Sequence, residues 1–254
     1  MKPAFNSFEP HHLGANWPAW TGGHGDEPAR WLAYFDLLGF TKLVEGNIAN
    51  AVDTYFKSRE IIEYWVAKHP GIHLACFSDS YVLYADDDTA RSFWPLEQAA
   101  RWIMNEHLQK TLPLQGALSC GQFFADSADN VFMGKGYLEA HTFAEDQDWI
   151  GFVLCRSATK HLTALRLLPS RRLNYRRWKI PFKSHKKPQK KIGLKPLYAY
   201  AIGVSSPVSG ENFYLESLRG MVADIKEQKV RRKYLNAIQF LEYFGVMLLV
   251  KSNS

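Results

Sequence analysis

Apolar residues along the chain fall into short runs separated by helical repeats. Runs rich in β-branched and aromatic residues predict strands, and apolar residues spaced three or four apart predict amphipathic helices. The predicted strands cover residues 31–36, 72–77, 81–84, 114–124 and 150–155, and the predicted helices cover 47–69, 89–109 and 137–145. The order β-α-β-β-α-β-(α)-β is that of a ferredoxin-like α+β fold with a split βαβ sheet.

The pattern changes towards both ends. Residues 1–29 are rich in Gly, Pro, His and Trp without periodicity, which predicts an irregular N-terminal arm. After the last core strand comes a basic stretch with a predicted strand at 178–182, and residues 218–250 then predict one or two amphipathic helices. We therefore expect three parts: an arm (1–29), a core domain (30–155), and an extension (156–254) packed on the same domain.

Composition narrows the class of protein. Of the 254 residues 46% are hydrophobic, which is enough for a sizeable core, and no apolar run reaches the roughly 20 residues of a membrane span. The N-terminus lacks the apolar stretch of a secretion signal. Three cysteines lie in apolar, strand-like runs without metal-ligand spacing. Free buried thiols and a cytoplasmic location are therefore expected.

The net charge of +6 is unevenly distributed. No acidic residue occurs between Asp148 and Glu211, and 14 Lys and Arg residues lie between Arg156 and Lys195. Such a stretch could contact nucleic acid, a membrane surface or a triphosphate. A solvated loop is the more frequent origin of such a charge run, so neither a membrane nor a nucleic acid is expected as partner.

Two aspartates stand where chemistry is expected. Asp36 ends the first predicted strand, and Asp79 lies in the turn of the predicted hairpin. Two carboxylates that converge at a sheet rim repel each other unless a hard cation lies between them. Oxygen ligands of this kind suit Mg²⁺ or Mn²⁺, and the backbone carbonyl of Leu37 could add a ligand. A two-metal site for a nucleoside triphosphate is therefore predicted.

The residues that follow Asp36 favour an anion. Gly39 and Phe40 open a turn before a helix, where free N–H groups and the helix dipole attract phosphate. Tyr34 lies two residues before Asp36, so it faces the same side of the sheet and could contact a base. A buried strand tyrosine accounts for Tyr34 equally well, and an aspartate before a tight turn is often only a cap or turn former.

These segments resemble the metal motifs of class III nucleotide cyclases. Residues 34–41 (Tyr-Phe-Asp-Leu-Leu-Gly-Phe-Thr) resemble the first motif and residues 77–80 (Phe-Ser-Asp-Ser) the second. Residues 114–121 resemble the next core strand of that family, and 130–134 resemble the segment before its last active-site helix. The resemblance covers about residues 30–155, which would make the core domain a cyclase catalytic domain.

This sequence departs from the family pattern at the residues that read the base and at those that stabilise the transition state. Typical members carry a base-reading Lys shortly before the second Asp, whereas residues 74–77 (Leu-Ala-Cys-Phe) offer no amine. Typical members also carry Asn and Arg on the last helix, and residues 137–142 have neither. Together with residues 134–141 and 147–151, the pattern looks most like the pyrimidine cyclases of bacterial Pycsar anti-phage systems.

The resemblance implies an activity and partners. It implies conversion of UTP to 3′,5′-cyclic UMP and pyrophosphate with Mn²⁺ or Mg²⁺, in a homodimer with interfacial sites. The product would activate a separate effector in anti-phage defence. CTP as substrate, and a degenerate domain that senses a nucleotide without turnover, stay open as alternatives.

Other polar residues near these motifs have weaker support. Lys135 could bind phosphate near the last active-site segment, and Arg156 could replace the missing Arg. His141 fits a core histidine better than a ligand. The acidic runs at 86–88 and 145–148 are predicted to be solvated loop charge.

Overall fold

The computed structural model describes residues 28–128, 130–169, 173–183, 196–200 and 213–252, with no account of side chains from 245 onward. Residues 1–27 of the predicted arm and residues 184–195 of the basic stretch therefore lie outside the described residues. Among the described helices, none combines the length and apolarity that a membrane crossing requires.

Seven strands form one mixed sheet in the order β2-β3-β1-β4-β7-β9-β8, and β5 pairs with β6 in a separate hairpin. The strands are β1 (Ala29–Leu37), β2 (Ile72–Phe77), β3 (Ser80–Ala85), β4 (Leu114–Gln122), β5 (Phe124–Asp126), β6 (Val131–Met133), β7 (Phe152–Leu154), β8 (Tyr175–Trp178) and β9 (Leu197–Tyr200). The pairs β1–β3, β1–β4 and β2–β3 are antiparallel, as the split βαβ order requires. The predicted α+β fold is thus confirmed.

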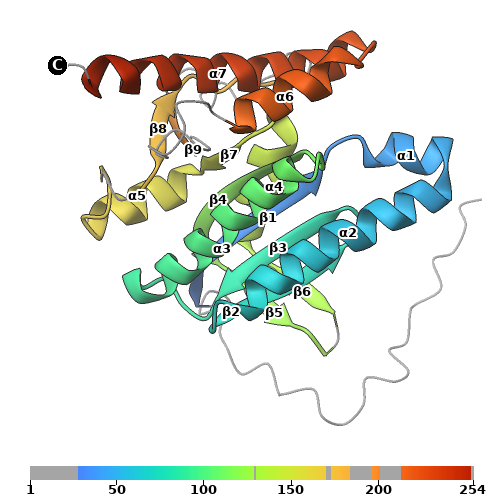
Figure 1. The fold of residues 1–254 in the computed structure, drawn as a ribbon. Helices are drawn as coiled ribbons and strands as arrows, with labels where there is room; N and C mark the ends of the chain where they lie inside the picture. The colour runs from blue at the N-terminus through green and yellow to red at the C-terminus, as the bar shows by residue number, and fades with distance from the viewer. Residues whose placement is uncertain (1–27, 129, 170–172, 184–195, 201–212, 253–254) are drawn as a thin grey trace, which may run out of the picture.

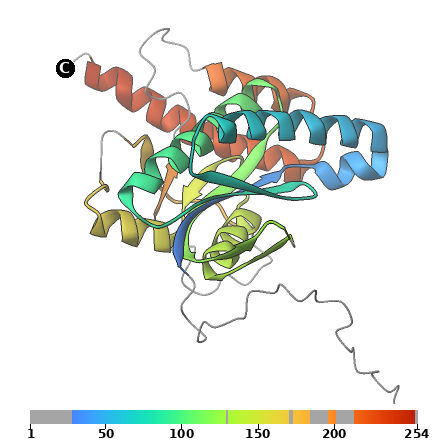
Figure 2. The ribbon, with the colours of Figure 1, turned by 90° about the horizontal axis from the view of Figure 1, so that it is seen from below.

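Helices cover both faces of the sheet. They are α1 (Phe40–Gly46), α2 (Ile48–Ala67), α3 (Ala90–Gln109), α4 (Lys135–Asp146), α5 (Arg156–Ala164), α6 (Phe213–Ala223) and α7 (Gln228–Ser252). Figure 1 shows α6 and α7 together at the end of the sheet where β1 runs out towards α1. In Figure 2 the sheet separates α2 and α3 from α4 and the β5–β6 hairpin.

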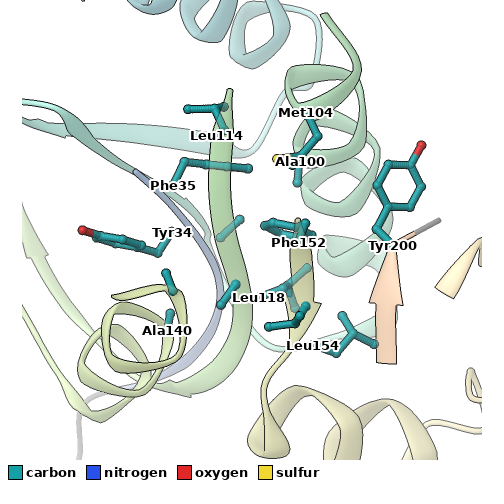
Figure 3. Close-up of a cluster of buried hydrophobic side chains, with 14 of the residues drawn as sticks. Tyr34, Phe35, Ala100, Met104, Leu114, Leu118, Ala140, Phe152, Leu154 and Tyr200 are labelled. Carbon is teal, nitrogen blue, oxygen red and sulfur yellow. The ribbon is translucent and has the colours of Figure 1, made fainter. Parts of the chain in front are cut away.

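The alternation of side chains along β1 divides the core into two halves. The Tyr34 side chain lies on the same side of β1 as Ala140 of α4, whereas Phe35 lies on the opposite side, where Met104 of α3 is found (Figure 3). The Phe35 ring stacks on that of Phe152, with 5.2 Å between the ring centroids. Since successive strand residues face opposite sides, Asp36 shares the α4 side with Tyr34.

Glycines of β4 allow neighbouring elements to approach closely on both faces of the sheet. A Cβ on Gly116 of β4 would lie 2.6 Å from the Tyr34 carbonyl oxygen and 2.8 Å from Cδ2 of Phe152. A Cβ on Gly121 would lie 3.2 Å from the backbone of Gly136 in α4. Gly116 and Gly121 thus let β1, β7 and α4 pack directly against β4.

Several predicted boundaries need correction. The strand expected at 178–182 is wrong: β8 ends at Trp178, and Phe182 forms only an isolated bridge with Gln147. The short elements β6, α5 and β9 do not follow from the apolar pattern. Helix α5 lies in the basic stretch whose charge favours a loop, and three- or four-residue strands are too short to show a period.

Cys76, Cys120 and Cys155 are free, as expected. Only Cys155 is fully buried, whereas Cys76 and Cys120 are half-buried, so the expectation of buried thiols is wrong for these two.

Stability should depend on pH through His107, which is fully buried on α3. Its ring lies 2.7 Å (Nε2) from Ser58 Oγ and 2.9 Å (Nδ1) from the Ile103 carbonyl oxygen. Burial lowers the pKa of His107 from 6.5 to about 4. Because the unfolded chain takes up the proton first, stability is lost as pH falls from about 6.5 towards 4, by about 2 to 3 kcal/mol.

Denaturant unfolding of the wild type and H107Q at pH 7 and pH 4.5 tests this. The stability advantage of the wild type should shrink by about 2 to 3 kcal/mol at the lower pH. Parallel acid losses in wild type and H107Q would contradict the assignment.

Candidate functional site

Asp36 and Asp79 meet at one rim of the sheet. In the register of the sheet, Asp36 lies between Ser80 of β3 and Gln115 of β4. Asp79 occupies the two-residue turn between β2 and β3, and its carbonyl oxygen accepts a hydrogen bond of 3.0 Å from the Leu37 N–H. The strand end and the hairpin turn are therefore joined through the backbone, which fixes the two aspartates side by side.

Neighbouring side chains orient the Asp36 carboxylate. Gln115 Nε2 donates to Oδ2 at 2.9 Å, and Ser80 Oγ donates to Oδ1 at 3.4 Å. The Tyr34 hydroxyl in turn donates to Ser80 Oγ at 2.8 Å. Tyr34 is 2% exposed, so its ring is not available to a base and it is a buried strand tyrosine. Its role in this geometry is to hold Ser80.

The electrostatic environment of Asp36 is unusual. Its carboxylate is half-buried, and burial followed by the charges of Glu145 and Asp79 raises its pKa from 3.8 to about 7. Glu145 lies in the last turn of α4 and is also half-buried. The prediction that residues 145–148 are solvated loop charge is therefore wrong for Glu145. A third carboxylate faces the aspartate pair because α4 packs across β1 and β4.

A lysine from the C-terminal helix reaches the same site. Lys233 Nζ of α7 donates to Gln115 Oε1 at 3.2 Å, while the amide of Gln115 holds Asp36. Lys233 is half-buried. Burial and the nearby charge of Lys183 lower its pKa, and the charges of Asp36, Asp148 and Glu145 oppose that shift. A Lys–Gln–Asp chain thus connects α7 with the rim of the sheet.

Asp148 fixes α7 in this position. It is 6% exposed, and its Oδ2 accepts from Arg232 Nε at 2.5 Å. Asn236 Nδ2 donates to the Asp148 carbonyl oxygen at 2.7 Å. Asp148 is therefore a buried partner of α7 and not the solvated charge that the sequence predicts. The Asp148 carboxylate is buried whereas the Arg232 side chain is half-exposed, so removing Arg232 would leave a buried charge without this partner.

The donors at the rim fit a hard divalent cation. Asp36 and Asp79 offer carboxylate oxygens only. Burial of Asp36, and after it the charges of Glu145 and Asp79, raise the pKa of Asp36. Mg²⁺ and Mn²⁺ bind such oxygens and keep open positions for water or phosphate. Asp36, Asp79 and Glu145 are not a closed set, because their ligand atoms are not all within 4.8 Å of one another.

Of three further residues of the predicted nucleotide site, Gly39 and Phe40 lie at the rim and Lys135 lies at the far end of α4. Gly39 has φ 82° in the left-handed region and precedes α1, so it and Phe40 lie just beyond Asp36. Lys135 begins α4, whereas Glu145 lies in its last turn, about 15 Å away at the rise of a helix. Within one chain Lys135 is therefore distant from the aspartate pair.

His141 and Arg156 have other surroundings. His141 packs edge-on against Tyr34 with 5.2 Å between ring centroids, which agrees with a core histidine. Arg156 is exposed at the start of α5, directly after Cys155, whose N–H donates to the Leu118 carbonyl oxygen in the middle of β4.

Sequence reasoning missed Gln115, Glu145 and Lys233. Gln115 had a signal, since it is a polar residue in an otherwise apolar predicted strand. Glu145 ends a predicted helix, and only the crossing of α4 over β1 brings it to Asp36. Lys233 is separated from Gln115 by 118 positions in the sequence. It lies in a helix that also carries several exposed basic residues. Nothing local distinguishes it from them.

No family model and no curated protein matches the chain. Among solved structures, the adenylyl cyclase CyaB from P. aeruginosa has 13% identity and a TM-score of 0.46, covering 68% of this chain and 92% of its own. Adenylate cyclases from Trypanosoma brucei give 10% identity and a TM-score of 0.47, covering 68% and 88%. At such identities and TM-scores the structural likeness supports no conclusion about function. The site is therefore described from the strand order and the contacts of this chain.

Metal affinity at this rim should depend on pH around neutrality. Because Asp36 has a pKa of about 7, protons compete with a cation below that pH. The affinity for Mn²⁺ is expected to fall by up to about tenfold per unit between pH 7 and 5.5. In K233M the loss of Mn²⁺ affinity should begin at a higher pH, because the positive charge that favours the ionised Asp36 carboxyl is gone.

Calorimetric titration with Mn²⁺ from pH 5.5 to 8 measures this. K233R should resemble the wild type, and so should K229M, which changes an exposed lysine one turn earlier on α7. An affinity that is flat over this range in the wild type would show that Asp36 is not a ligand or titrates elsewhere.

Proposed function

We propose that the chain is a metal-dependent nucleotide cyclase that converts a pyrimidine nucleoside triphosphate, UTP in first place, to the 3′,5′-cyclic monophosphate and pyrophosphate. The observation that carries the proposal is the meeting of Asp36 and Asp79 at a strand end and a hairpin turn of a split βαβ sheet. These are the positions of the two motifs that resemble class III cyclases. The raised pKa of Asp36 supports a cation between them.

Asp36 and Asp79 would hold the metal ions, with the Leu37 carbonyl as a further donor. The bound cations would lower the pKa of the attacking ribose hydroxyl and neutralise charge on the leaving pyrophosphate. Gln115 and Ser80 keep the Asp36 carboxylate in one orientation. Such orienting partners matter because they fix the ligand before the cation arrives.

The reaction is an in-line displacement at the α-phosphorus. The ribose 3′-oxygen forms a bond to the α-phosphorus, and the bond from that phosphorus to the oxygen bridging to the β-phosphate breaks. Pyrophosphate leaves with the electron pair, and the hydroxyl proton passes to water. The protein contributes mainly position and charge, as is general for phosphoryl transfer.

The preference for a pyrimidine follows from the position where related cyclases read a purine. Ala75 on β2 is 3% exposed and offers only a methyl group, and no neighbour on that strand from Leu74 to Phe77 has an amine. UTP is placed before CTP on the resemblance to Pycsar cyclases. The same resemblance supports cyclic UMP as an anti-phage messenger that acts through a separate effector.

A second candidate is a domain that binds the nucleotide without turnover. It is favoured by the transition-state Asn and Arg missing from α4, where residues 137–142 supply neither. The two functions share the metal and triphosphate site, so only product formation separates them.

Incubation of the purified chain with each of the four triphosphates and Mn²⁺ tests the proposal. One cyclic product should dominate, from UTP or CTP, detected by chromatography and mass spectrometry. D36N and D79N should each lower the rate by at least about 100-fold, because a charged metal ligand is lost.

D53N provides the matched control, since Asp53 is an exposed helical aspartate paired with Lys57. It should retain full activity, and thermal melts should show that all variants fold. Binding of a triphosphate without product from any of the four would favour the sensing domain instead.

The proposal includes a homodimer with active sites at the interface, on the resemblance to class III cyclases and because Lys135 lies far from the Asp36–Asp79 pair within one chain. Specific activity should therefore fall on dilution below the dimer dissociation constant, in step with the mass measured by light scattering. A monomer with full activity at every concentration would contradict the dimer while leaving the cyclase proposal standing.

A further inference from the structure

A second cluster of metal-binding side chains lies far from the aspartate pair. Asp88, Cys120 and His161 each offer a ligand atom, and these atoms all lie within 4.8 Å of one another. In the part of the chain that the structure describes, no other three His, Cys, Asp or Glu residues meet this closely. The three residues come from the loop before α3, from β4 and from α5.

The surrounding contacts hold the cluster together. His161 Nε2 lies 2.8 Å from the Asp88 carbonyl oxygen and 3.4 Å from its Oδ2. The imidazole packs against Trp31, with 5.1 Å between ring centroids. The Cys120 N–H donates to Ser157 Oγ at 3.0 Å, which ties β4 to α5. The donors are therefore brought together by the fold and not by one flexible loop.

We propose that Asp88, Cys120 and His161 bind a transition-metal ion of the zinc type, with water in a fourth position. Oxygen, nitrogen and sulfur donors together suit Zn²⁺ or Co²⁺, whereas Mg²⁺ and Mn²⁺ prefer oxygen. Ligand atoms of a tetrahedral site with bonds of about 2.0–2.3 Å lie about 3.3–3.8 Å apart. Donors within 4.8 Å reach that geometry by movements of about 1 Å, which small side-chain rotations supply.

This site is separate from the nucleotide rim in place and in chemistry. Cys120 and Gln115 lie five residues apart on β4, a rise of about 17 Å along a strand. Cys120 pairs in register with Trp31, and Gln115 pairs with Asp36, so the two clusters lie at opposite ends of β1 and β4. A cation at the aspartate pair therefore has no contact with the thiol.

The bound ion would act as a structural link. It would connect the β3–α3 loop with β4 and α5, and the Ser157 hydrogen bond already ties β4 to α5. Because a nitrogen that binds a cation has no proton to donate, ligation through Nε2 would replace its contact with the Asp88 carbonyl oxygen by a link through the ion. A ligand that binds only the folded chain stabilises it by mass action. Zn²⁺ should therefore raise the melting temperature of chelator-treated protein.

Titration of chelator-treated full-length chain with Co²⁺ tests the proposal directly. A thiolate ligand gives bound Co²⁺ a near-ultraviolet charge-transfer band, which oxygen ligands at the aspartate pair do not give. We expect one equivalent of Co²⁺ to produce this band and Zn²⁺ to displace it. C120S should abolish the band, and H161Q and D88N should each weaken Co²⁺ binding at least about tenfold.

Two control variants show which residues the band depends on. C76S changes another half-buried free cysteine, on β2, and should keep the band. D36N disables the nucleotide rim and should also keep it, so the result does not depend on cyclase activity. No band with folded wild-type protein, or a band unchanged in C120S, would overturn the proposal and leave Asp88 and His161 as an ion pair only.

Discussion

The pairing of β1 with β3 on one side and β4 on the other is the constraint on which the site depends. It places Asp36 between Ser80 and Gln115, and the Leu37–Asp79 backbone hydrogen bond holds the hairpin turn beside the strand end. Close packing beneath this rim requires Gly116, where any Cβ would collide with β1 and Phe152. A shift of register by one residue would send Asp36 to the opposite face. The two carboxylates therefore converge because the sheet is rigid.

Convergence has an electrostatic cost that the surrounding structure offsets only in part. Burial, followed by the charges of Glu145 and Asp79, raises the pKa of Asp36, whereas Gln115 and Lys233 lower it. The Asp36 carboxyl is left with a pKa of about 7. A divalent cation beside it would favour the ionised form. Helix α7 contributes to this balance, since its contacts with Asp148 fix it where Lys233 reaches Gln115. The C-terminal extension is thus part of the wall of the site.

The same two strands carry different donor sets at their two ends. At one end the donors are oxygen atoms on an open rim, which suits a cation shared with a triphosphate. At the other end Asp88, Cys120 and His161 offer oxygen, sulfur and nitrogen in a tighter group. Oxygen donors on an open rim suit an exchangeable ion, whereas mixed donors in a tighter group suit an ion that links elements. One sheet can carry both groups of donors because β1 and β4 are long enough to keep two bound cations apart.

The sequence by itself determined the elements whose signals are local. Periodicity predicted β1, α2, α3 and the β2–β3 hairpin, and the strand-end and turn positions singled out Asp36 and Asp79. Only the tertiary structure placed Glu145, Lys233 and Gln115 around them and joined Asp88, Cys120 and His161. Such contacts span large separations in the sequence, 73 positions for His161–Asp88 and 118 for Lys233–Gln115. A period of two or 3.6 residues carries no information on such distances, so packing of helices on the sheet decided them.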